Sequence, residues 1–243
     1  MIIGVSGYSG SGKDLVGTMI QFLTSKTDSK VTLDEIIDFP INHEYWLEEK
    51  SGWEIKKWAG KLKTIASLLT GIPVEKFEDQ KFKKTNLGIE WNQIVRVFGE
   101  YYDGHVEDWT DEVRPMSVRE FLQKLGTDGL RNGLHSNVWV NALMADYKHT
   151  QVQWANGPIG GYEDGELPNW IITDTRFPNE AEAIREKEGI MIRVERPGVK
   201  PINNHPSEVS LDDYTFDHVI QNNGSLEDLL KKVKSILQFH KII

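Results

Sequence analysis

The N-terminal end of the chain has a hydrophobic pattern that predicts a strand followed by a helix. Ile2–Ser6 is a short apolar run that ends in glycines, which is typical of a buried strand. Residues 13–24 then carry apolar side chains at helical spacing, so one helix face is predicted to turn inward. The inward positions of this helix are Leu15, Val16, Met19, Ile20 and Leu23.

The C-terminal part of the chain continues this alternation. Buried strands are predicted at residues 170–174, 190–194 and 218–220, and helices at 179–187 and after the N-cap Ser225. Strands that alternate with helices favour an α/β fold, in which a parallel sheet is covered by helices on both faces. The closing helix is amphipathic, with Leu226, Leu229, Leu230, Val233 and Leu237 predicted to face inward.

The middle of the chain gives weaker patterns. Residues 26–51 are acidic without clear periodicity and resemble an insertion, whereas 58–69 favour a helix. Residues 76–115 mix charged and aromatic side chains and allow no assignment. The stretch 149–168 is rich in glycine and poor in apolar residues, which predicts a flexible excursion. The chain is therefore expected to form one domain, with an insertion region near 27–116 and a short lid near 197–213.

A clearer signal begins at Ser117. Ser117 and Glu120 have the spacing of a capping box, and the helix behind them carries the apolar stripe Val118, Phe121, Leu122 and Leu125. A second helix is predicted at 138–147. The helix that begins after Ser117 also has a polar stripe of one cation, one amide and one hydroxyl, each four residues apart. This stripe suits a phosphorylated ligand that bears a base; the alternative is that it is an ordinary solvated helix face. This stripe is Arg119, Gln123 and Thr127, and Asp128 and Arg131 extend it.

Composition narrows the class of protein. The chain has 243 residues, of which 39% are hydrophobic, and no apolar run long enough to cross a bilayer. The start lacks the basic segment of a signal peptide, and cysteine is absent, so a cytoplasmic protein without disulfides is expected. The net charge of −9 argues against a broad nucleic-acid surface, because phosphate backbones are bound mainly by Lys and Arg. A small phosphorylated ligand needs only a few local cations and remains compatible.

The strongest chemical signal is the stretch Gly7–Asp14, which reads GYSGSGKD. It matches the phosphate-binding pattern G-x-x-x-x-G-K between a predicted strand and a predicted helix, the context that this motif requires. Glycines let backbone N–H groups turn toward phosphate oxygens, and the helix N-terminus adds partial positive charge. We therefore expect ATP to be bound by Gly7, Ser9, Gly10, Ser11, Gly12, Lys13, Asp14 and Leu15; a glycine-rich turn without a ligand is the alternative.

One position departs from the usual motif. Asp14 stands where Ser or Thr normally binds Mg²⁺ through its hydroxyl. A carboxylate can also hold the metal, directly or through water, so Asp14 is a candidate metal ligand. The seven histidines show no metal-binding spacing, and His205 in the predicted lid is more typical of a plain loop residue than of a base.

Further candidate residues follow the predicted strands. Asp174 ends a buried strand, where carboxylates lie at the ligand crevice of an open α/β sheet, and Arg176 is two residues on. Asp174 is therefore a second candidate metal ligand or a proton acceptor, and Arg176 a phosphate ligand. Arg193 and Arg196 bracket the end of the next strand, and Lys200 lies in the loop beyond, which could close over phosphates or be an ordinary basic loop.

Several blocks together resemble the bacteriophage-type deoxynucleoside monophosphate kinases, relatives of adenylate kinase and dephospho-coenzyme A kinase. The resemblance includes the Asp after Gly12-Lys13 and covers about half of the chain in the same order. The most specific blocks are Leu125-Gly126-Thr127-Asp128 and Asp174-Thr175-Arg176. The others are Ala59-Gly60 with Lys63, Phe77-Glu78, Thr85-Asn86-Leu87, Arg119, Trp139-Val140, Arg196-Pro197-Gly198, His205, Glu208 and Asn223-Gly224-Ser225-Leu226.

The resemblance implies a P-loop kinase fold and transfer of a phosphoryl group from ATP to a deoxynucleoside monophosphate with Mg²⁺. It places Lys13, Asp174, Arg176 and Arg196 at the reaction centre and adds Asn223 to the ATP site. It implies that the acceptor nucleotide is held by Gly60, Lys63, Lys83, Arg119, Gln123, Thr127, Asp128 and Trp139. Lys83 stands where an Arg is expected, and residues 26–51 and 149–168 look inserted. Acceptor base, sugar preference and a homodimer are left open.

Three alternatives remain at the level of sequence. The first is a P-loop kinase for another small acceptor, such as dephospho-coenzyme A or phosphomevalonate. The second is a nucleotide-dependent switch, although the Asn-Lys-x-Asp motif for guanine is absent. The third is a P-loop protein that binds nucleotide without turnover. Small nucleotides, and neither nucleic acid nor membrane, are the expected partners in the leading interpretation.

Overall fold

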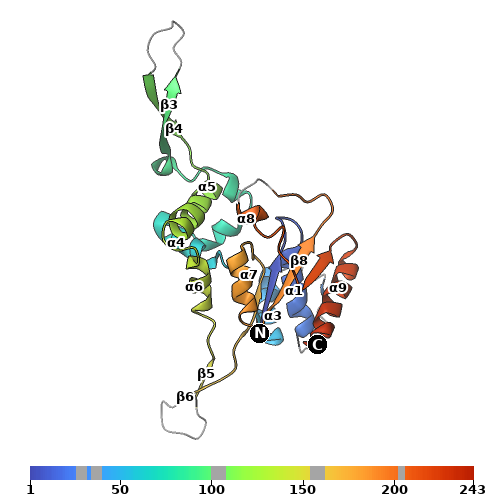
Figure 1. Cartoon of the computed structure of the whole chain (residues 1–243). Coiled ribbons are helices and arrows are strands. Elements are labelled where there is room, and N and C mark those ends of the chain that lie inside the picture. The colour runs from blue at the N-terminus through green and yellow to red at the C-terminus, as the bar shows by residue number, and fades with distance from the viewer. Residues whose placement is uncertain (26–31, 34–39, 100–107, 154–161, 202–205) are drawn as a thin grey trace. The chain divides into compact units, whose positions relative to one another are not determined.

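The computed structural model describes residues 1–25, 32–33, 40–99, 108–153, 162–201 and 206–243 (Figure 1). The chain divides into two compact units, one formed by residues 1–58 with 140–243 and the other by residues 59–139. The predicted insertion near 27–116 therefore overlaps both units, since residues 40–58 belong to the first.

The first unit is built on a five-stranded sheet in which every pair of neighbouring strands is parallel. The strand order is β2-β7-β1-β8-β9, so the first strand of the chain lies at the centre, with Ile3 opposite Ile171 on one side and Ile190 on the other. This confirms the predicted α/β class. The strands are β1 (Ile2–Ser6), β2 (Trp53–Lys56), β7 (Asn169–Ile172), β8 (Ile190–Glu195) and β9 (His218–Gln221).

Strand β2 was not predicted from the sequence. It has only four residues, and Glu54 and Lys56 make half of them charged, so its hydrophobic pattern is weak. Tertiary contacts fix it as an edge strand: it pairs with β7, and the buried Gln21 side chain donates a hydrogen bond to the Trp53 carbonyl at 2.7 Å. A helix, α3 (Pro40–Ser51), precedes it within the region whose weak pattern was interpreted as an insertion.

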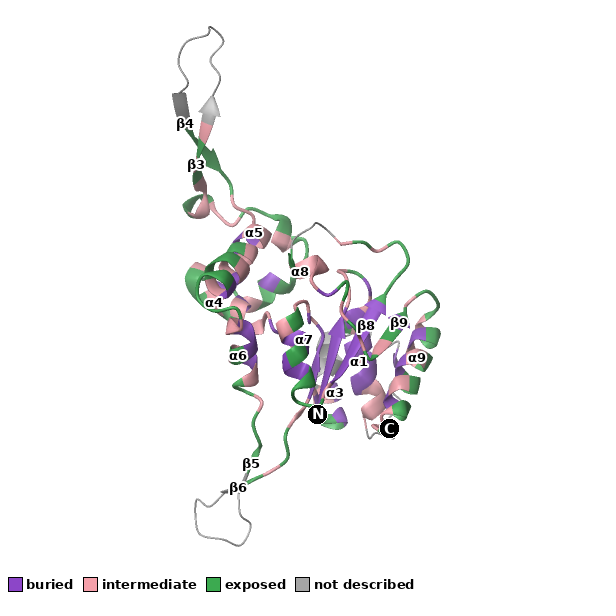
Figure 2. Cartoon of the chain, in the orientation of Figure 1, coloured by how far each residue is buried: buried purple, intermediate pink, exposed green. Residues whose placement is uncertain are grey.

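Helices cover both faces of this sheet, and buried residues are concentrated in it (Figure 2). Because side chains alternate along a strand, Ile3 and Val5 join one hydrophobic cluster, whereas Ile2 joins the other. The first cluster lies under α1 (Lys13–Thr24) and α9 (Leu226–Phe239). The second lies under α7 (Pro178–Arg185) and the end of α6 (Val138–Met144).

The closing helix α9 begins as predicted. The Ser225 hydroxyl accepts a hydrogen bond from the Asp228 N–H, and the Asp228 carboxylate accepts one from the Ser225 N–H, which completes a capping box. Leu229, Val233 and Leu237 are buried against the sheet. Leu226 and Leu230 are partly buried in the same cluster, so the predicted inward face is confirmed.

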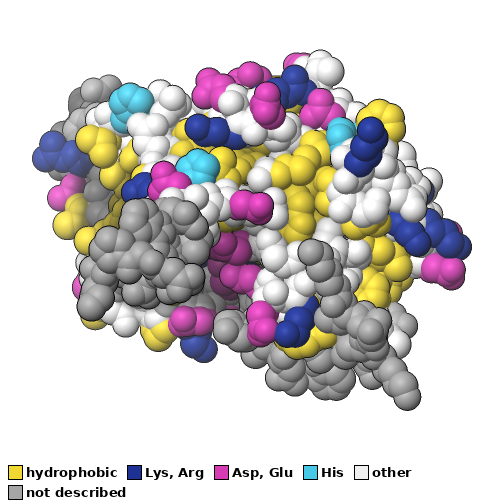
Figure 3. Space-filling model, turned by 90° about the horizontal axis from the view of Figure 1, so that it is seen from below, with side chains coloured by type: hydrophobic (Ala, Val, Ile, Leu, Met, Phe, Trp, Pro, Cys, Tyr) yellow, Lys and Arg dark blue, Asp and Glu magenta, His cyan; other side chains and the backbone are white. Residues whose placement is uncertain are grey.

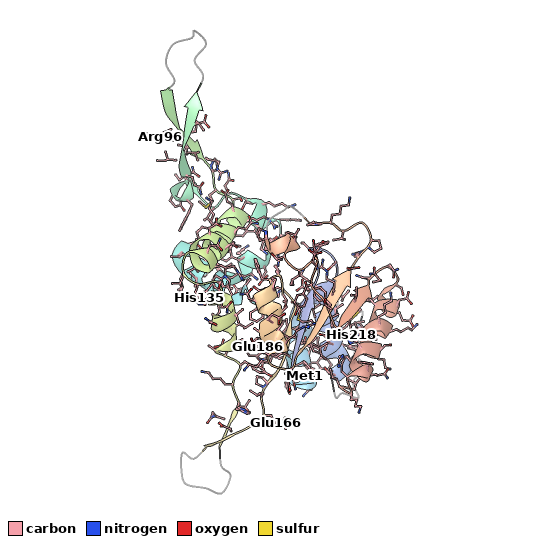
Figure 4. The ribbon with its side chains drawn as sticks, viewed as in Figure 1. Met1, Arg96, His135, Glu166, Glu186 and His218 are labelled. Atoms are coloured by element: carbon pink, nitrogen blue, oxygen red, sulfur yellow. The ribbon has the colours of Figure 1, made fainter. Side chains whose placement is uncertain are left out.

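The second unit is a small helical body with a hairpin. Its core is formed by Ala66, Phe77, Val118 and Phe121. The helical elements are α4 (Gly60–Thr70), the 3-10 helices η1 (Val74–Glu78), η2 (Phe82–Lys84) and η3 (Ile89–Trp91), α5 (Val118–Gln123) and the π-helix η4 (Lys124–Asn132). The hairpin pairs β3 (Gln93–Gly99) with β4 (Asp108–Arg114), and Arg96 on β3 forms an ion pair with Asp111 at 3.6 Å (Figure 4).

Three local expectations need correction. The Ser117 hydroxyl accepts the Glu120 N–H at 3.1 Å, but the Glu120 carboxylate binds Arg114, so the predicted capping box is only half formed. The excursion at 149–168 contains the paired strands β5 (Gln151–Gln153) and β6 (Tyr162–Asp164). The lid segment contains a short helix, α8 (Pro206–Val209), instead of loop throughout.

Two further features bear on the class of protein. None of the helices in the described part of the chain is long and apolar enough to span a bilayer. On the face shown in Figure 3, Lys and Arg side chains lie singly or in small groups among acidic ones, in keeping with a net charge of −9.

Candidate active site

The loop from β1 to α1 has the backbone of a phosphate cradle. Gly10 and Gly12 adopt left-handed conformations, with φ of 85° and 100°, which other residues rarely adopt. Gly12 is the N-cap of α1, and no side chain caps that end of the helix. A side chain at Gly10 would extend into open space, so the loop is open there. The first N–H groups of α1 therefore suit an anion as their partner.

The interior of the loop carries unsatisfied polar groups. The Ser11 hydroxyl is buried and has no hydrogen-bond partner among the described residues. Lys13, the first residue of α1, is only 8% exposed, and its Nζ makes no hydrogen bond or ion pair with any residue that the structure describes. Burying an ammonium group without a partner is costly, so this loop fits an anionic ligand better than an empty turn.

The electrostatic surroundings of Lys13 contain both signs of charge. Burial lowers the pKa of Lys13 below its ordinary value. The nearby carboxylates of Asp14, Asp174 and Glu208 oppose that change, whereas the Arg176 guanidinium reinforces it. The predicted site residues Asp14, Asp174 and Arg176 are therefore close enough to Lys13 to act on its charge. A polyphosphate in the loop would favour the charged ammonium and raise the pKa of Lys13 again.

The carboxylate of Asp14 is held in place but remains largely exposed. It accepts a hydrogen bond at 2.8 Å from the hydroxyl of Thr173, the residue that directly follows β7. The Lys57 ammonium lies 3.9 Å from the same oxygen, which compensates part of its negative charge. A carboxylate at this position therefore need not repel the phosphates of a nucleotide as strongly as the sequence alone suggests.

Asp174 is positioned by Trp58, a residue that sequence analysis did not single out. The Trp58 backbone N–H donates to the Asp174 carboxylate at 2.8 Å, and the indole N–H donates to the Thr175 hydroxyl at 3.2 Å. Trp58 is buried and lies two residues after the end of β2, so the missed edge strand brings it to the carboxyl end of β7. No local pattern in the sequence marks Trp58 for this role, because the contact joins residues far apart in the chain.

Arg176 lies in the same segment and is paired with a carboxylate. Its Nη1 lies 2.9 Å from Glu208 of α8, whose side chain is mostly buried. The buried Glu180 carboxylate accepts the backbone N–H groups of Arg176 and Phe177 at 2.9 and 3.1 Å, which fixes the turn into α7. Glu208 thus orients the Arg176 guanidinium while Glu180 fixes its backbone, and a phosphate would have to share the guanidinium with Glu208.

The other cations near the predicted lid divide into two groups. Arg193 is buried in β8; it donates to Asp212 at 2.9 Å and stacks over the Tyr8 ring at 4.7 Å. These contacts give Arg193 a structural role in holding the phosphate loop, in place of the predicted role in the lid. Arg196 and Lys200 are exposed beyond the end of β8, as a mobile phosphate ligand would require.

The predicted acceptor residues all lie in the second unit. Lys63 is buried in α4 and forms an ion pair with Glu78, and Arg119 on α5 donates to Gln80 at 3.1 Å. Lys83 lies in η2, and Gly60 is the first residue of α4. Trp139 is buried, and its indole N–H donates to the Gly126 carbonyl at 2.9 Å, which ties it to the π-helix. Their proposed contact with a nucleotide stays a prediction.

The polar stripe is shorter than predicted. Arg119 and Gln123 lie on α5, but the helix changes at Lys124 into the π-helix η4, which holds Thr127 and Asp128. Backbone hydrogen bonds of a π-helix reach one residue farther than in an α-helix, so the four-residue spacing no longer keeps Thr127 in line. Arg131 is buried and donates to the Ser136 carbonyl at 3.3 Å. Such π segments are frequent at functional sites.

Three remaining predicted residues lie around the phosphate loop or beyond the described chain. Leu15 is partly buried in the cluster under α1. Asn223 accepts a hydrogen bond from Lys232 at 3.1 Å, whereas its neighbour Asn222 contacts the loop directly: its Nδ2 donates to the Ser11 carbonyl at 2.8 Å. His205 lies outside the described residues.

Comparison with known proteins gives a consistent result. The family model described as deoxynucleotide monophosphate kinase matches residues 74–233. The deoxynucleotide monophosphate kinase of Enterobacteria phage T4 is 32% identical over 163 residues, which is 67% of this chain and 57% of that protein. The protein of the same name from Escherichia phage RB69 is 31% identical over 122 residues, or 50% of this chain and 45% of that one. The chain thus spans about half the length of these relatives.

The matched range begins after the phosphate loop. It contains the helix at Arg119, the buried Trp139 and the segment from Asp174 to Arg176, but not Gly7 or Lys13. The loop geometry, which fits a phosphate, and the family match are therefore separate observations. The chain belongs to the deoxynucleotide monophosphate kinase family.

Proposed function

We propose that this chain transfers the γ-phosphoryl group of ATP to a deoxynucleoside monophosphate, which yields ADP and a deoxynucleoside diphosphate. The observation that carries the proposal is the buried Lys13 ammonium, which has no side-chain partner among the described residues and lies within electrostatic range of Asp174 and Arg176. Membership in the deoxynucleotide monophosphate kinase family supports this acceptor class over dephospho-coenzyme A or phosphomevalonate.

The proposed roles follow from the contacts. The N–H groups of Gly10, Gly12, Lys13 and Asp14 and the Lys13 ammonium bind the ATP phosphates, while the Ser11 N–H stays bonded to the Tyr8 carbonyl. Arg176 and Arg196 stabilise the negative charge on the phosphoryl group as it moves. Asn223 remains a proposed ATP contact, and Lys63 and Arg119 the proposed contacts of the acceptor phosphate. Such a site needs little covalent chemistry from the protein, because positioning and electrostatics supply the rate.

Mg²⁺ is the proposed metal, and the donor groups present fit it. Mg²⁺ is commonly held by one or two carboxylates together with substrate phosphates, while it keeps several waters. Asp14, fixed by Thr173, and Asp174, fixed by Trp58, offer two carboxylates. The described residues include no cluster of three or more His, Asp or Glu side chains suited to a metal. When bound, the ion would neutralise charge on the phosphates; the protein's task is to keep the two carboxylates in place.

A coupled assay of ADP release tests the proposal. The purified protein is incubated with ATP and Mg²⁺ and with each deoxynucleoside monophosphate, each ribonucleoside monophosphate and dephospho-coenzyme A in turn. We expect ADP release that depends on one or more deoxynucleoside monophosphates. Release with dephospho-coenzyme A alone would contradict the acceptor class, and nucleotide binding without release for any acceptor would favour a switch or a protein without turnover.

A further inference from the structure

The segment after β9 is attached to the phosphate loop by one side chain. The Asn222 Nδ2 donates to the Ser11 carbonyl at 2.8 Å, and the Asn222 backbone N–H donates to the Glu195 carbonyl at 2.6 Å at the end of β8. The amide also packs closely against the next residue, since a Cβ at Gly12 would lie 2.6 Å from Nδ2. Asn222 therefore bridges the end of the sheet and the loop residue that precedes Lys13 by two positions.

This contact fixes the orientation of a peptide group in the cradle. A trans peptide is planar, so its C=O and the following N–H point in opposite directions. Because Asn222 holds the Ser11 carbonyl, the N–H of Gly12 is directed away from Asn222. The Ser11 N–H is also occupied, as it donates to the Tyr8 carbonyl at 3.1 Å. The turn at Ser11 is thus held at both of its peptide bonds.

We infer that Asn222 is a positioning residue of the nucleotide site. It keeps the Ser11–Gly12 peptide in the orientation that presents the Gly12 N–H to a nucleotide phosphate, and its amide lies where a side chain at position 12 would begin. The inference deepens the proposed function and rests on it for the identity of the ligand. It also separates the two neighbouring asparagines, because the Asn223 side chain is bonded to Lys232 instead of the loop.

Two substitutions and one matched control test this role. Asn222→Ala removes the donor, and Asn222→Asp removes it while keeping the size of the side chain. Gln221→Ala is the control, because Gln221 is exposed, directly precedes Asn222 and donates from its own amide to the Glu195 side chain at 2.6 Å. The measurements are calorimetric affinity for MgADP, hydrogen exchange of the peptide spanning residues 7–14 without ligand, and the separate KM values for ATP and acceptor.

Asn222→Ala is expected to bind MgADP about three- to tenfold more weakly than wild type, the range for one lost hydrogen bond. Asn222→Asp should bind it at least as weakly, because it also brings a negative charge next to the phosphate loop. Exchange should accelerate within residues 7–14 only, and the KM for ATP should rise while that for the acceptor stays constant. If Asn222 had only a structural role, its variants would unfold at a lower temperature, and the KM for ATP would not rise separately from the KM for the acceptor. Gln221→Ala should match wild type in all three measurements.

The inference is overturned if Asn222→Ala and Asn222→Asp match Gln221→Ala in MgADP affinity and in exchange of the loop. If Asn222→Ala does not fold, Asn222→Asp decides, and failure of both to fold would replace positioning by a structural role. A wild-type protein that binds MgADP but phosphorylates no deoxynucleoside monophosphate would remove the proposed function. The affinity and exchange results would still decide the role of Asn222.

Discussion

The two units hold their buried lysines in different ways. In the first unit, Lys13 is buried at the start of α1 and its Nζ has no hydrogen-bond or ion-pair partner among the described residues. In the second, Lys63 is almost equally buried but forms an ion pair with Glu78. A buried ammonium without a partner is stabilised in its charged form by an external anion, whereas a paired one can stay charged without any ligand. The first arrangement therefore indicates a ligand more strongly than the second.

The largest expected effect tests the first half of this comparison. Lys13→Ala should lower kcat by about a hundred- to a thousandfold or more, the cost of removing one preorganised charge donor at the transition state. The fold should persist, because in the ligand-free protein the variant removes a desolvated charge. Steady-state kinetics and circular dichroism check this, with Lys57→Ala as a comparison for loss of a lysine that lies beside Asp14. Near-normal turnover of Lys13→Ala would show that the loop is not the ATP site.

The difference also explains how far the sequence could predict the site. The phosphate loop is a local feature, because its glycines, its lysine and the flanking strand and helix are contiguous in the chain. The structure confirms the predicted strand and helix and shows Gly10 and Gly12 in left-handed conformations. Trp58 and Asn222 could not be found in this way. Trp58 acts on Asp174 and Asn222 on Ser11, and both contacts depend on which strands of the sheet are neighbours.

The second unit was predicted less well for a related reason. Its core of Ala66, Phe77, Val118 and Phe121 joins α4 and α5 to short 3-10 helices, which have no strong periodic pattern in a sequence. The hairpin β3–β4 alternates apolar and polar residues only in part, and Ile94 opposite Val113 remains largely exposed. Residues 76–115 therefore gave no assignment, although they contain η2, η3, β3, β4 and the end of η1.

A second prediction tests the acceptor residues. Arg119→Ala should raise the KM for the acceptor about ten- to a hundredfold and leave that for ATP unchanged, because a charge-assisted contact to a phosphate is worth about 1.5–3 kcal/mol. The helix should persist, since Ala is a better helix former than Arg. Kinetics with each substrate varied in turn measure the two constants. An equal rise in both KM values would remove Arg119 from the acceptor site.

A smaller effect on the KM for the acceptor is expected when Glu78, the ion-pair partner of Lys63, is replaced. Glu78→Gln removes the negative charge beside Lys63 and keeps the shape of the side chain, so the ammonium should bind an acceptor phosphate more readily. The KM for the acceptor should fall by about two- to fivefold, which corresponds to a modest ion pair. Glu75→Gln, an exposed position on the same 3-10 helix, is the matched control. A higher KM would indicate that Glu78 positions Lys63 for the acceptor.

The smallest predicted effect is on the free energy of unfolding, and it comes from two histidines at the β9 edge of the first unit's sheet. His218 on β9, labelled in Figure 4, has its Nε2 2.7 Å from the Nε2 of His240 at the end of α9. Burial lowers the pKa of His218, the neighbouring His240 lowers it further, and Asp217 opposes the change. Both rings cannot easily carry a proton at this distance, because like charges repel.

The sign of the pH dependence follows from this lowered pKa. Between the pKa of folded His218 and its ordinary value of 6.5, the unfolded chain binds more protons, so the free energy of unfolding rises with pH. Stability should therefore be full above that ordinary value and decrease as the pH falls through the lower, folded pKa. His240→Asn should weaken the dependence by removing one of the two rings. Because both histidines belong to the first unit, hydrogen exchange at acidic pH should accelerate in α9 before it does in residues 59–139. Equal acceleration in both units, or a wild-type pH profile in His240→Asn, would contradict a role for this pair.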